Sequence, residues 1–253
     1  MEIIFLGTGT SHGIPVIGSN DPVCLSTDIK DKRLRASLFI SCKDKHFVID
    51  CGPDFRQQML KNDIARLDAI LFTHEHADHT AGLDDIRPFC RKNGAMPIYA
   101  HKRVLDNLSE RYKYIFTSEN RYAGAPSITS ITIENKPFVI DNIDIMPINI
   151  NHGNVQVFGF GIEKFAYLTD VKTISSEEKQ KLRGLDILVV NALRIASHPT
   201  HFNLEEALNF IEEIKPKKAY LTHISHKLGF HQKVQQKLPN NVFLAYDNLK
   251  ITL

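Results

Sequence analysis

The sequence predicts an α/β protein in which two mixed β-sheets pack face to face and helices cover them. Short apolar runs of β-type composition recur along the whole chain, and pairs of them read as hairpins in both halves. Helical segments lie between these hairpins, an alternation that favours layered sheets and helices. The 253 residues contain no internal repeat, low-complexity tract or linker. We therefore expect a single compact domain, residues 1–253.

The strands are predicted from apolar runs bounded by turn residues. The first, Glu2–Leu6, runs into the glycine-rich turn that begins at Gly7. Hairpins turn through Lys43-Asp44-Lys45, Asp141-Asn142 and Glu163-Lys164. The remaining predicted strands are Ala36–Ser41, His46–Ile49, Ala69–Phe72, Pro97–Ala100, Phe138–Ile140, Ile143–Ile148, Gln156–Gly161, Phe165–Leu168, Ile187–Val190, Lys218–Leu221, Val242–Tyr246 and Leu249–Leu253.

Helices are fewer, and Asn203–Ile214 is the clearest. Asn203 can cap it, an apolar stripe runs from Leu204 to Ile214, and Pro216 ends it. The other predicted helices are Asp54–Asn62, the segment after Asp78, Lys102–Tyr114 and Ser175–Arg183.

Composition excludes several classes of protein. Apolar residues make up 43% and charged residues 24%, with a net charge of +2, so composition argues for no nucleic-acid or membrane partner. No apolar run approaches the ~20 residues that span a bilayer. The first residues do not resemble a secretory signal, and the four cysteines show no C-x-x-C spacing. We therefore expect reduced thiols and a cytoplasmic location.

A dense cluster of metal-binding side chains follows the apolar run that ends at Phe72. His74, His76, Asp78 and His79 place three imidazoles and a carboxylate within six residues. Such nitrogen and oxygen donors suit zinc or manganese-type ions. Asp78 and His79 are adjacent and point differently from the histidine pair, which suits a second ion beside the first.

Further ligands have to come from later strand ends. Three residues stand just beyond predicted strands: His152, Asp170 and His223. Alone, each would be an ordinary turn or core residue. Together with the first cluster, their repeated placement at the carboxyl ends of strands predicts a two-metal centre.

The order Asp50-Cys51-Gly52, His74-x-His76-x-Asp78-His79, His152, Asp170 and His223 resembles the metallo-β-lactamase superfamily over nearly the whole chain. That family has a four-layer αββα sandwich, which agrees with the elements predicted above. Within it, the segments Thr8–Pro15 and Leu221–His226 resemble the PhnP-like phosphodiesterases, relatives of tRNase Z.

The resemblance implies a dinuclear hydrolase. It puts His74, His76 and His152 on one metal, Asp78, His79 and His223 on the other, and Asp170 between them. A metal-bridging hydroxide would attack phosphorus in cyclic nucleotides, ribose cyclic phosphates or related small diesters. The two divalent ions would be zinc or manganese, with iron as a further option.

Catalysis also needs a proton donor for the leaving oxygen. By position His201 matches the general acid of the PhnP-like enzymes, and Asp78 and Asp170 are expected to act in catalysis with it. His198 is an alternative donor or a substrate contact. His12, in the first glycine turn, and the cations Arg33 and Arg35 are further candidates for substrate binding, although a charged run is more often a solvated face.

The chain departs from the PhnP-like pattern in two respects. Those proteins often carry a structural zinc held by three cysteines and a histidine; here only Cys24 and His226 stand at such positions. We therefore predict no structural zinc. A segment at about residues 105–131 is longer than expected and rich in aromatic residues. It is interpreted as a lid over the site or, preferably, as a contact in a homodimer.

Other functions remain open on sequence grounds. Thioester or lactam hydrolysis, as in glyoxalase II-like relatives, uses the same ligands. A tRNase Z role is disfavoured because no long basic arm is present and the charge is nearly neutral. Flavo-diiron redox chemistry would need a carboxylate where His76 stands. A structural metal-binding protein that has lost catalysis is disfavoured because all seven ligands are present.

Overall fold

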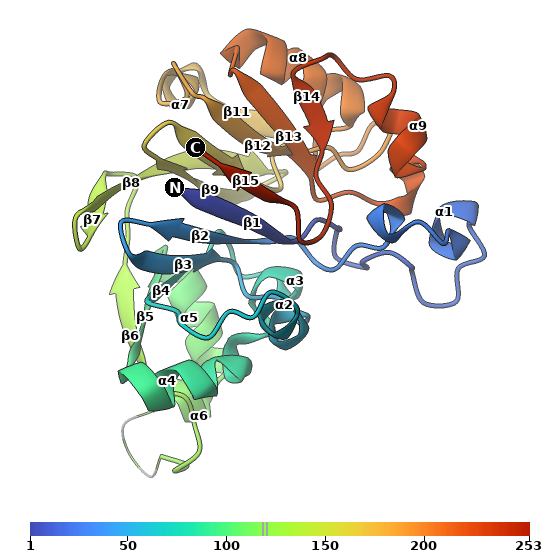
Figure 1. Cartoon of the computed structure of the whole chain (residues 1–253). Coiled ribbons are helices and arrows are strands. Elements are labelled where there is room, and N and C mark those ends of the chain that lie inside the picture. The colour runs from blue at the N-terminus through green and yellow to red at the C-terminus, as the bar shows by residue number, and fades with distance from the viewer. Residues whose placement is uncertain (118, 120) are drawn as a thin grey trace.

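The computed structural model describes residues 1–117, 119 and 121–253 and contains two mixed β-sheets packed face to face (Figure 1). In the first sheet the strand order is β15-β1-β2-β3-β4-β5-β6. Pairing is antiparallel from β15 to β3 and parallel from β3 to β6. The bounds are β1 Glu2–Gly7, β2 Ser37–Cys42, β3 Lys45–Ile49, β4 Ala69–Leu71, β5 Met96–Ala100, β6 Ile128–Thr132 and β15 Lys250–Thr252.

The second sheet has the order β11-β8-β9-β10-β12-β13-β14, and β7 pairs with the start of β8. The strands β10, β12, β13 and β14 are parallel, so their carboxyl ends lie along one edge. The bounds are β7 Phe138–Ile140, β8 Ile143–His152, β9 Val155–Ile162, β10 Phe165–Leu168, β11 Thr173–Ile174, β12 Ile187–Asn191, β13 Lys218–Thr222 and β14 Val242–Leu244.

Three apolar clusters separate the layers and confirm the predicted four-layer αββα sandwich. One lies between the sheets and includes Phe47 and Tyr167; a second joins the first sheet to its helices through Phe55 and Phe89. A third packs helices on the second sheet.

The α-helices are α1 Pro22–Leu25, α2 Phe55–Lys61, α3 Ala77–Thr80, α4 Arg87–Asn93, α5 Lys102–Arg111, α6 Lys113–Phe116, α7 Ser176–Gln180, α8 Leu204–Ile214 and α9 His231–Gln235; the 3-10 helices are η1 Ile29–Asp31, η2 Leu83–Ile86 and η3 His226–Leu228.

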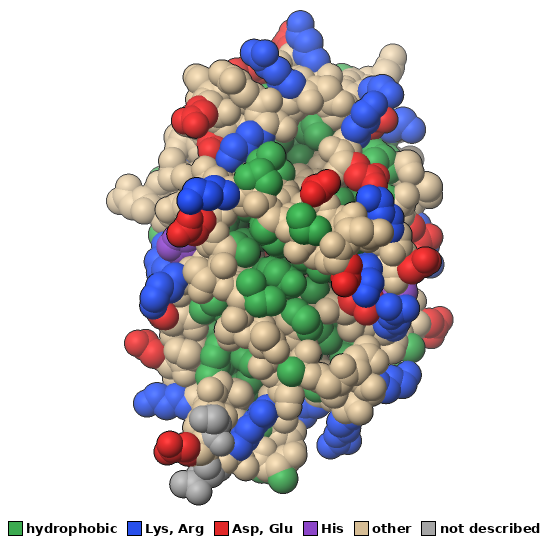
Figure 2. Space-filling view, turned by 90° about the vertical axis from the view of Figure 1, so that its left-hand side faces the viewer, with side chains coloured by type: hydrophobic (Ala, Val, Ile, Leu, Met, Phe, Trp, Pro, Cys, Tyr) green, Lys and Arg blue, Asp and Glu red, His purple; other side chains and the backbone are tan. Residues whose placement is uncertain are grey.

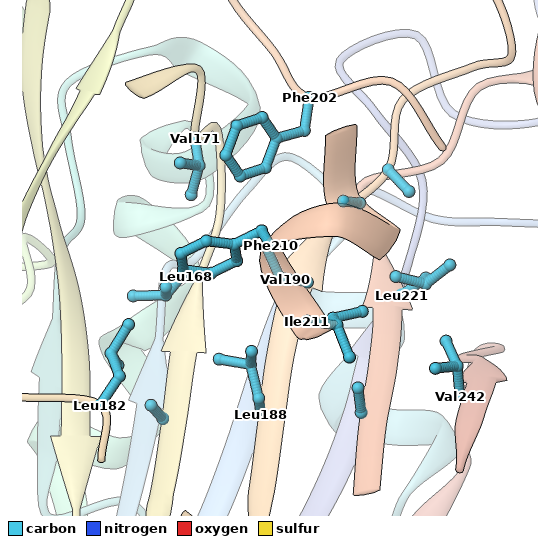
Figure 3. Close-up of a cluster of buried hydrophobic side chains, with 14 of the residues drawn as sticks. Leu168, Val171, Leu182, Leu188, Val190, Phe202, Phe210, Ile211, Leu221 and Val242 are labelled. Atoms are coloured by element: carbon cyan, nitrogen blue, oxygen red, sulfur yellow. The ribbon is translucent and has the colours of Figure 1, made fainter. Parts of the chain in front are cut away.

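Helix α8 illustrates how the sequence builds the outer layer. Asn203 accepts a hydrogen bond from the backbone N–H of Glu206, and Glu206 accepts one from Asn203, which completes a capping box. Phe210 and Ile211 then lie over the second sheet, as Figure 3 shows. The third apolar cluster therefore anchors the strands whose carboxyl ends carry the predicted metal ligands.

Most predicted strands are found within two residues of their expected ends, and the differences are local. β8 continues to His152, so this histidine ends the strand rather than following it. The helix predicted over Lys102–Tyr114 ends at Arg111, and Tyr112 separates it from α6. Helices α4 and α9 and strands β6 and β11 were not predicted, because each is short and lacks a clear apolar period.

The segment 105–131 is largely part of the fold. Leu105, Leu108 and Ile115 lie in the apolar cluster of the first sheet, and its last residues enter strand β6. Its aromatic residues contact the neighbouring helical layer: the Tyr114 hydroxyl donates to Asp84. Ser118 and Asn120 lie outside the described residues. Whether the rest acts as a lid or a dimer contact stays a prediction.

Figure 2 shows the end of the sandwich where β7 lies, and hydrophobic side chains gather near the middle of this face. β7 pairs with the start of β8, whereas His152 ends β8, so this face is remote from the predicted metal ligands. Within the part of the chain that the structure describes, no helix has the length and apolar character needed to cross a membrane.

Candidate metal centre

The predicted ligands are positioned by strand ends and by the short helix α3. His74 lies in the loop after β4, and His76 precedes α3 as its N-cap residue. Asp78 and His79 lie in the single turn of α3. The backbone N–H of Cys51 donates to His79 O at 2.8 Å and so ties this turn to the loop after β3.

Three residues just beyond strands adopt a left-handed backbone conformation. Asp50 follows β3 with φ 64°, Asp170 lies two residues beyond β10 with φ 60°, and His223 follows β13 with φ 52°. This conformation is unfavourable for residues other than glycine and concentrates at functional sites. It bends the chain so that all three side chains enter the cluster.

The structure brings the seven predicted ligands together. His79 Nε2 lies 3.3 Å from Asp78 Oδ2 and 3.3 Å from Asp170 Oδ2. His223 Nε2 lies 3.6 Å from Asp78 Oδ2 and 3.4 Å from Asp170 Oδ1. On the other side His74 Nε2 is 3.0 Å from His76 Nδ1, and the His76 and His152 rings are 5.3 Å apart.

Two observations test whether divalent ions fit these residues. His79 Nε2 and both ring nitrogens of His223 are buried without a hydrogen-bond partner, which is uncommon for buried polar atoms. Donor atoms of His74, His79 and Asp170, and likewise those of Asp78, His79 and His223, lie within 4.8 Å of one another. These are nitrogen and oxygen donors suited to zinc or manganese, so the residues fit such ions.

The electrostatics of the cluster also favour bound cations. Burial lowers the pKa of His79, but the carboxylates of Asp78, Asp50 and Asp170 outweigh it and raise that pKa well above the ordinary range. Burial likewise acts to raise the pKa of Asp170, yet the His223 and His79 imidazoles hold it well below its usual value. A buried concentration of carboxylates therefore demands positive charge beside it.

Asp50 orients one of the ligands. Its Oδ2 lies 2.7 Å from Nδ1 of His79, and its carboxylate accepts hydrogen bonds from Thr73 N and Thr73 Oγ1, both at 2.8 Å. The His79 Nδ1–H then points at Asp50, and Nε2 is left to face the cluster. In the same way His152 Nδ1 lies 2.8 Å from the carbonyl of Thr200.

His201 lies directly beside the cluster. Its Nε2 is 2.8 Å from Asp170 Oδ1, and its Nδ1 is 3.2 Å from Nδ1 of His198. Burial lowers the pKa of His201 to about 4, against the opposing effect of Asp170. The ring is thus neutral near pH 7 in the free protein, and a bound anionic substrate would raise its pKa.

The predicted substrate-binding residues differ in placement. Arg33 does not reach the surface: it is 3% exposed, and its guanidinium donates to Thr8 Oγ1 and to the carbonyl of Ala245. The expectation that Arg33 contacts substrate is therefore wrong, because its guanidinium serves interior contacts. Arg35 is half-buried; it pairs with Asp54 at 3.1 Å and donates to the carbonyl of Ser11. His12 is exposed in that same loop.

The sequence interpretation missed several residues around the site. Asp50 was noted only as part of the family motif, and Thr73 and Thr200 were not considered. Arg103, on α5, pairs with Glu75 of the histidine cluster at 3.2 Å. Only the Asp50-Cys51-Gly52 motif could have signalled one of these roles, since the others depend on contacts between distant segments.

Cys24 lies in a small apolar cluster rather than in a ligand set. It packs with Ile14 and Val23, and Phe230 lies against them. Its Sγ accepts a hydrogen bond from the backbone N–H of Val16 at 3.4 Å. Among the described residues, the possible metal-binding groups include neither Cys24 nor His226. That the protein holds no structural zinc stays a prediction.

Comparison with known families gives one domain match. A model described as a beta-lactamase superfamily domain matches residues 45–224, which include every predicted metal ligand.

Curated relatives are similar to this chain along only part of their own length. An octanoyltransferase of Porphyromonas gingivalis is 40% identical over 253 residues, covering 99% of this chain and 51% of the relative. A ribonuclease Z of Enterococcus faecalis is 27% identical over 192 residues, covering 74% of this chain and 54% of the relative. The chain thus spans about half the length of the curated relatives it matches.

Solved structures match over the whole chain. A diphosphatase from the PhnP family has a TM-score of 0.93 and 37% identity, covering 100% of this chain and 97% of the other. The short form of human tRNase Z has a TM-score of 0.70 and 20% identity, covering 100% and 99%, and supports the fold alone.

Proposed function

The chain belongs to the beta-lactamase superfamily, and from this premise we propose that it is a dinuclear metal-dependent phosphodiesterase. Its substrates would be small diesters of the cyclic nucleotide or ribose cyclic phosphate type. The observation that carries the proposal is the convergence of seven imidazole and carboxylate ligands with His201 beside Asp170 at 2.8 Å.

The metal ligands are proposed in two sets that share one carboxylate. His74, His76 and His152 would hold one ion, Asp78, His79 and His223 the other, and Asp170 would contact both; the 3.3 and 3.4 Å separations of Asp170 from His79 and His223 support this. Zinc or manganese bound there would withdraw charge from a phosphoryl oxygen and make water a stronger acid.

His201 is proposed as the general acid. An anionic phosphodiester near the ring would favour the protonated imidazole, which could then deliver its proton to the leaving oxygen. The buried Asp170 would hold the ring in orientation through the 2.8 Å contact at Nε2. Three residues are proposed as substrate contacts: His198, whose Nδ1 lies 3.2 Å from His201 Nδ1, exposed His12 and half-buried Arg35, the last two between β1 and β2.

The class of substrate is supported by the similarity to a PhnP-family diphosphatase, which is 37% identical over the whole chain. In the hydrolysis of both diesters and diphosphates, water displaces an oxygen leaving group from phosphorus. A relative that is 27% identical is named ribonuclease Z, and that name describes an enzyme acting on RNA. The near-neutral charge of +2 favours small substrates over RNA.

A second candidate is hydrolysis of an acyl thioester. The observation in its favour is the Porphyromonas gingivalis relative named octanoyltransferase, 40% identical over 253 residues. Because the chain matches 51% of that protein, the other half can carry the named transferase activity. The part of the relative that corresponds to this chain would then hydrolyse a thioester of the same acyl group.

One assay separates the two candidates. The purified chain would be stripped of metal, reloaded with manganese or zinc, and tested on bis(p-nitrophenyl) phosphate, a 2′,3′-cyclic nucleotide, an octanoyl thioester and nitrocefin. We expect metal-dependent turnover of the phosphate substrates, and its loss in His76→Ala. Turnover of the thioester alone, with any metal, would overturn the phosphodiesterase proposal and support the second candidate.

We further propose that the protein is a cytoplasmic homodimer and that the segment at about residues 105–131 contributes to the dimer contact. Deleting residues 118–126 would then halve the mass measured by light scattering and leave the Michaelis constants unchanged. A raised Michaelis constant with an unchanged mass would instead assign this stretch to a lid.

A further inference from the structure

Helices α2 and α4 enclose a groove that the proposed hydrolase function does not use. It has a volume of about 740 Å³, which lies in the range of small-molecule sites. Phe55, Met59 and Leu60 come from α2, and Pro88 and Phe89 from α4. None of the proposed metal ligands lines the groove, so it is separate from the metal centre.

The floor of the groove is apolar, and the leucine at its side is open to water. Phe55, Met59 and Phe89 are buried beneath it. Leu60 stands at its side with 62% of its surface exposed. An apolar ligand lying on this floor would remove Leu60 from water, which is favourable in proportion to the area covered.

The rim of the groove is cationic. Arg56, Arg91 and Lys92 line it and form no ion pair with any described residue, whereas Arg87 is paired with Asp84. Asp85 is the other carboxylate of the lining. Three cations without a partner above an apolar floor complement a ligand that has an anionic head and an apolar tail, since guanidinium groups pair well with carboxylates.

We propose that this groove binds a medium-chain fatty carboxylate, with its chain on the accessible apolar side chains of Leu60, Ile64 and Pro88 and its head group among Arg56, Arg91 and Lys92. A neutral hydrocarbon would leave the cations unpaired, and a hydrophilic anion would leave Leu60 exposed. An amphiphilic anion satisfies both.

Calorimetric titration of the purified, metal-loaded protein with hexanoate, octanoate and decanoate tests the proposal, with octan-1-ol as the neutral comparator. We expect saturable one-to-one binding that tightens about two- to fourfold for each added methylene. Octan-1-ol should bind at least fivefold more weakly than octanoate. Because no turnover is measured, the outcome is independent of the proposed hydrolase function.

Two pairs of variants locate the ligand. Leu60→Gln should weaken octanoate binding at least fivefold, whereas Leu25→Gln, at a leucine 63% exposed on α1, should not. Arg56→Ala should weaken binding of octanoate but not of octan-1-ol, whereas Lys61→Ala, on the same helix outside the groove, should change neither. All four side chains are exposed, so the variants should fold, as circular dichroism would verify.

The proposal is overturned by any of three results. The first is the absence of saturable binding below the micellar concentration of the carboxylates. The second is octanoate binding that Leu60→Gln and Leu25→Gln affect equally. The third is equal affinity for octan-1-ol and octanoate, which would remove the role of the cationic rim.

Discussion

Phe202 donates its backbone N–H to the carbonyl of Val171 at 2.6 Å, and its ring lies beside the Val171 side chain (Figure 3). Each residue directly follows a residue of the site, since Val171 succeeds Asp170 and Phe202 succeeds His201. The apolar core under α8 therefore fixes the distance between the carboxylate that is proposed to contact both metals and the proposed acid.

Removing the Phe202 ring should disturb both stability and the site. Phe202→Ala would leave a cavity and cost about 3 kcal/mol of unfolding free energy, because the side chain is 9% exposed and core Phe→Ala changes cost 3–5 kcal/mol. Phe202→Leu should cost less than half as much. Urea unfolding measures both. An alanine variant as stable as the unchanged protein would contradict this role of the ring.

Asp50 should control metal affinity without being a ligand. Asp50→Ala removes the partner that holds His79 Nδ1 at 2.7 Å, and loss of such an orienting group typically weakens metal binding about 10- to 100-fold. Competition with a chromophoric chelator measures the affinity. Asp144→Ala, at an exposed carboxylate of β8, serves as the control and should leave affinity unchanged. Equal affinities in the two variants would refute the orienting role.

The effect of His201 should depend on the leaving group. His201→Gln should lower turnover about 100-fold or more for a diester with an alkyl leaving group, because general acid catalysis contributes about 10²–10⁴. With p-nitrophenolate, which needs no proton, the loss should be below tenfold. His198→Gln should have the smaller effect on both substrates. Full activity of His201→Gln on the alkyl diester, with normal metal content, would rule out the acid role.

His231 should make the fold sensitive to acid. Burial, together with the nearby charges of Arg33 and Lys30, lowers its pKa to about 4, although Asp28 and Asp31 oppose this. The unfolded chain binds a proton near its ordinary pKa of about 6.5, so stability is lost as pH falls from about 6.5 to 4. Unfolding free energies at pH 7 and 5 should differ less in His231→Gln than in the unchanged protein. An identical pH dependence would show that other groups cause the loss.

Much of the architecture follows from local sequence. The turns at Lys43-Asp44 and Glu163 adopt left-handed conformations, as expected for tight hairpins, and the Asn203–Glu206 capping box starts α8. The spacing of His74, His76, Asp78 and His79 also predicted the metal cluster. These features depend on residues within a few positions of one another, and short-range geometry is what a sequence pattern encodes.

Tertiary structure decided what no local pattern could encode. The basic run around Arg33 reads as a solvated face, yet Arg33 is buried because Thr8, Ala245 and His231, from both ends of the chain, surround its guanidinium. The orientation of His79 by Asp50 depends in the same way on the pairing of β3 with β4. The sequence by itself determined which residues could bind metal and which segments form strands; sheet register and core packing decided which side chains meet, because those contacts join residues far apart in the chain.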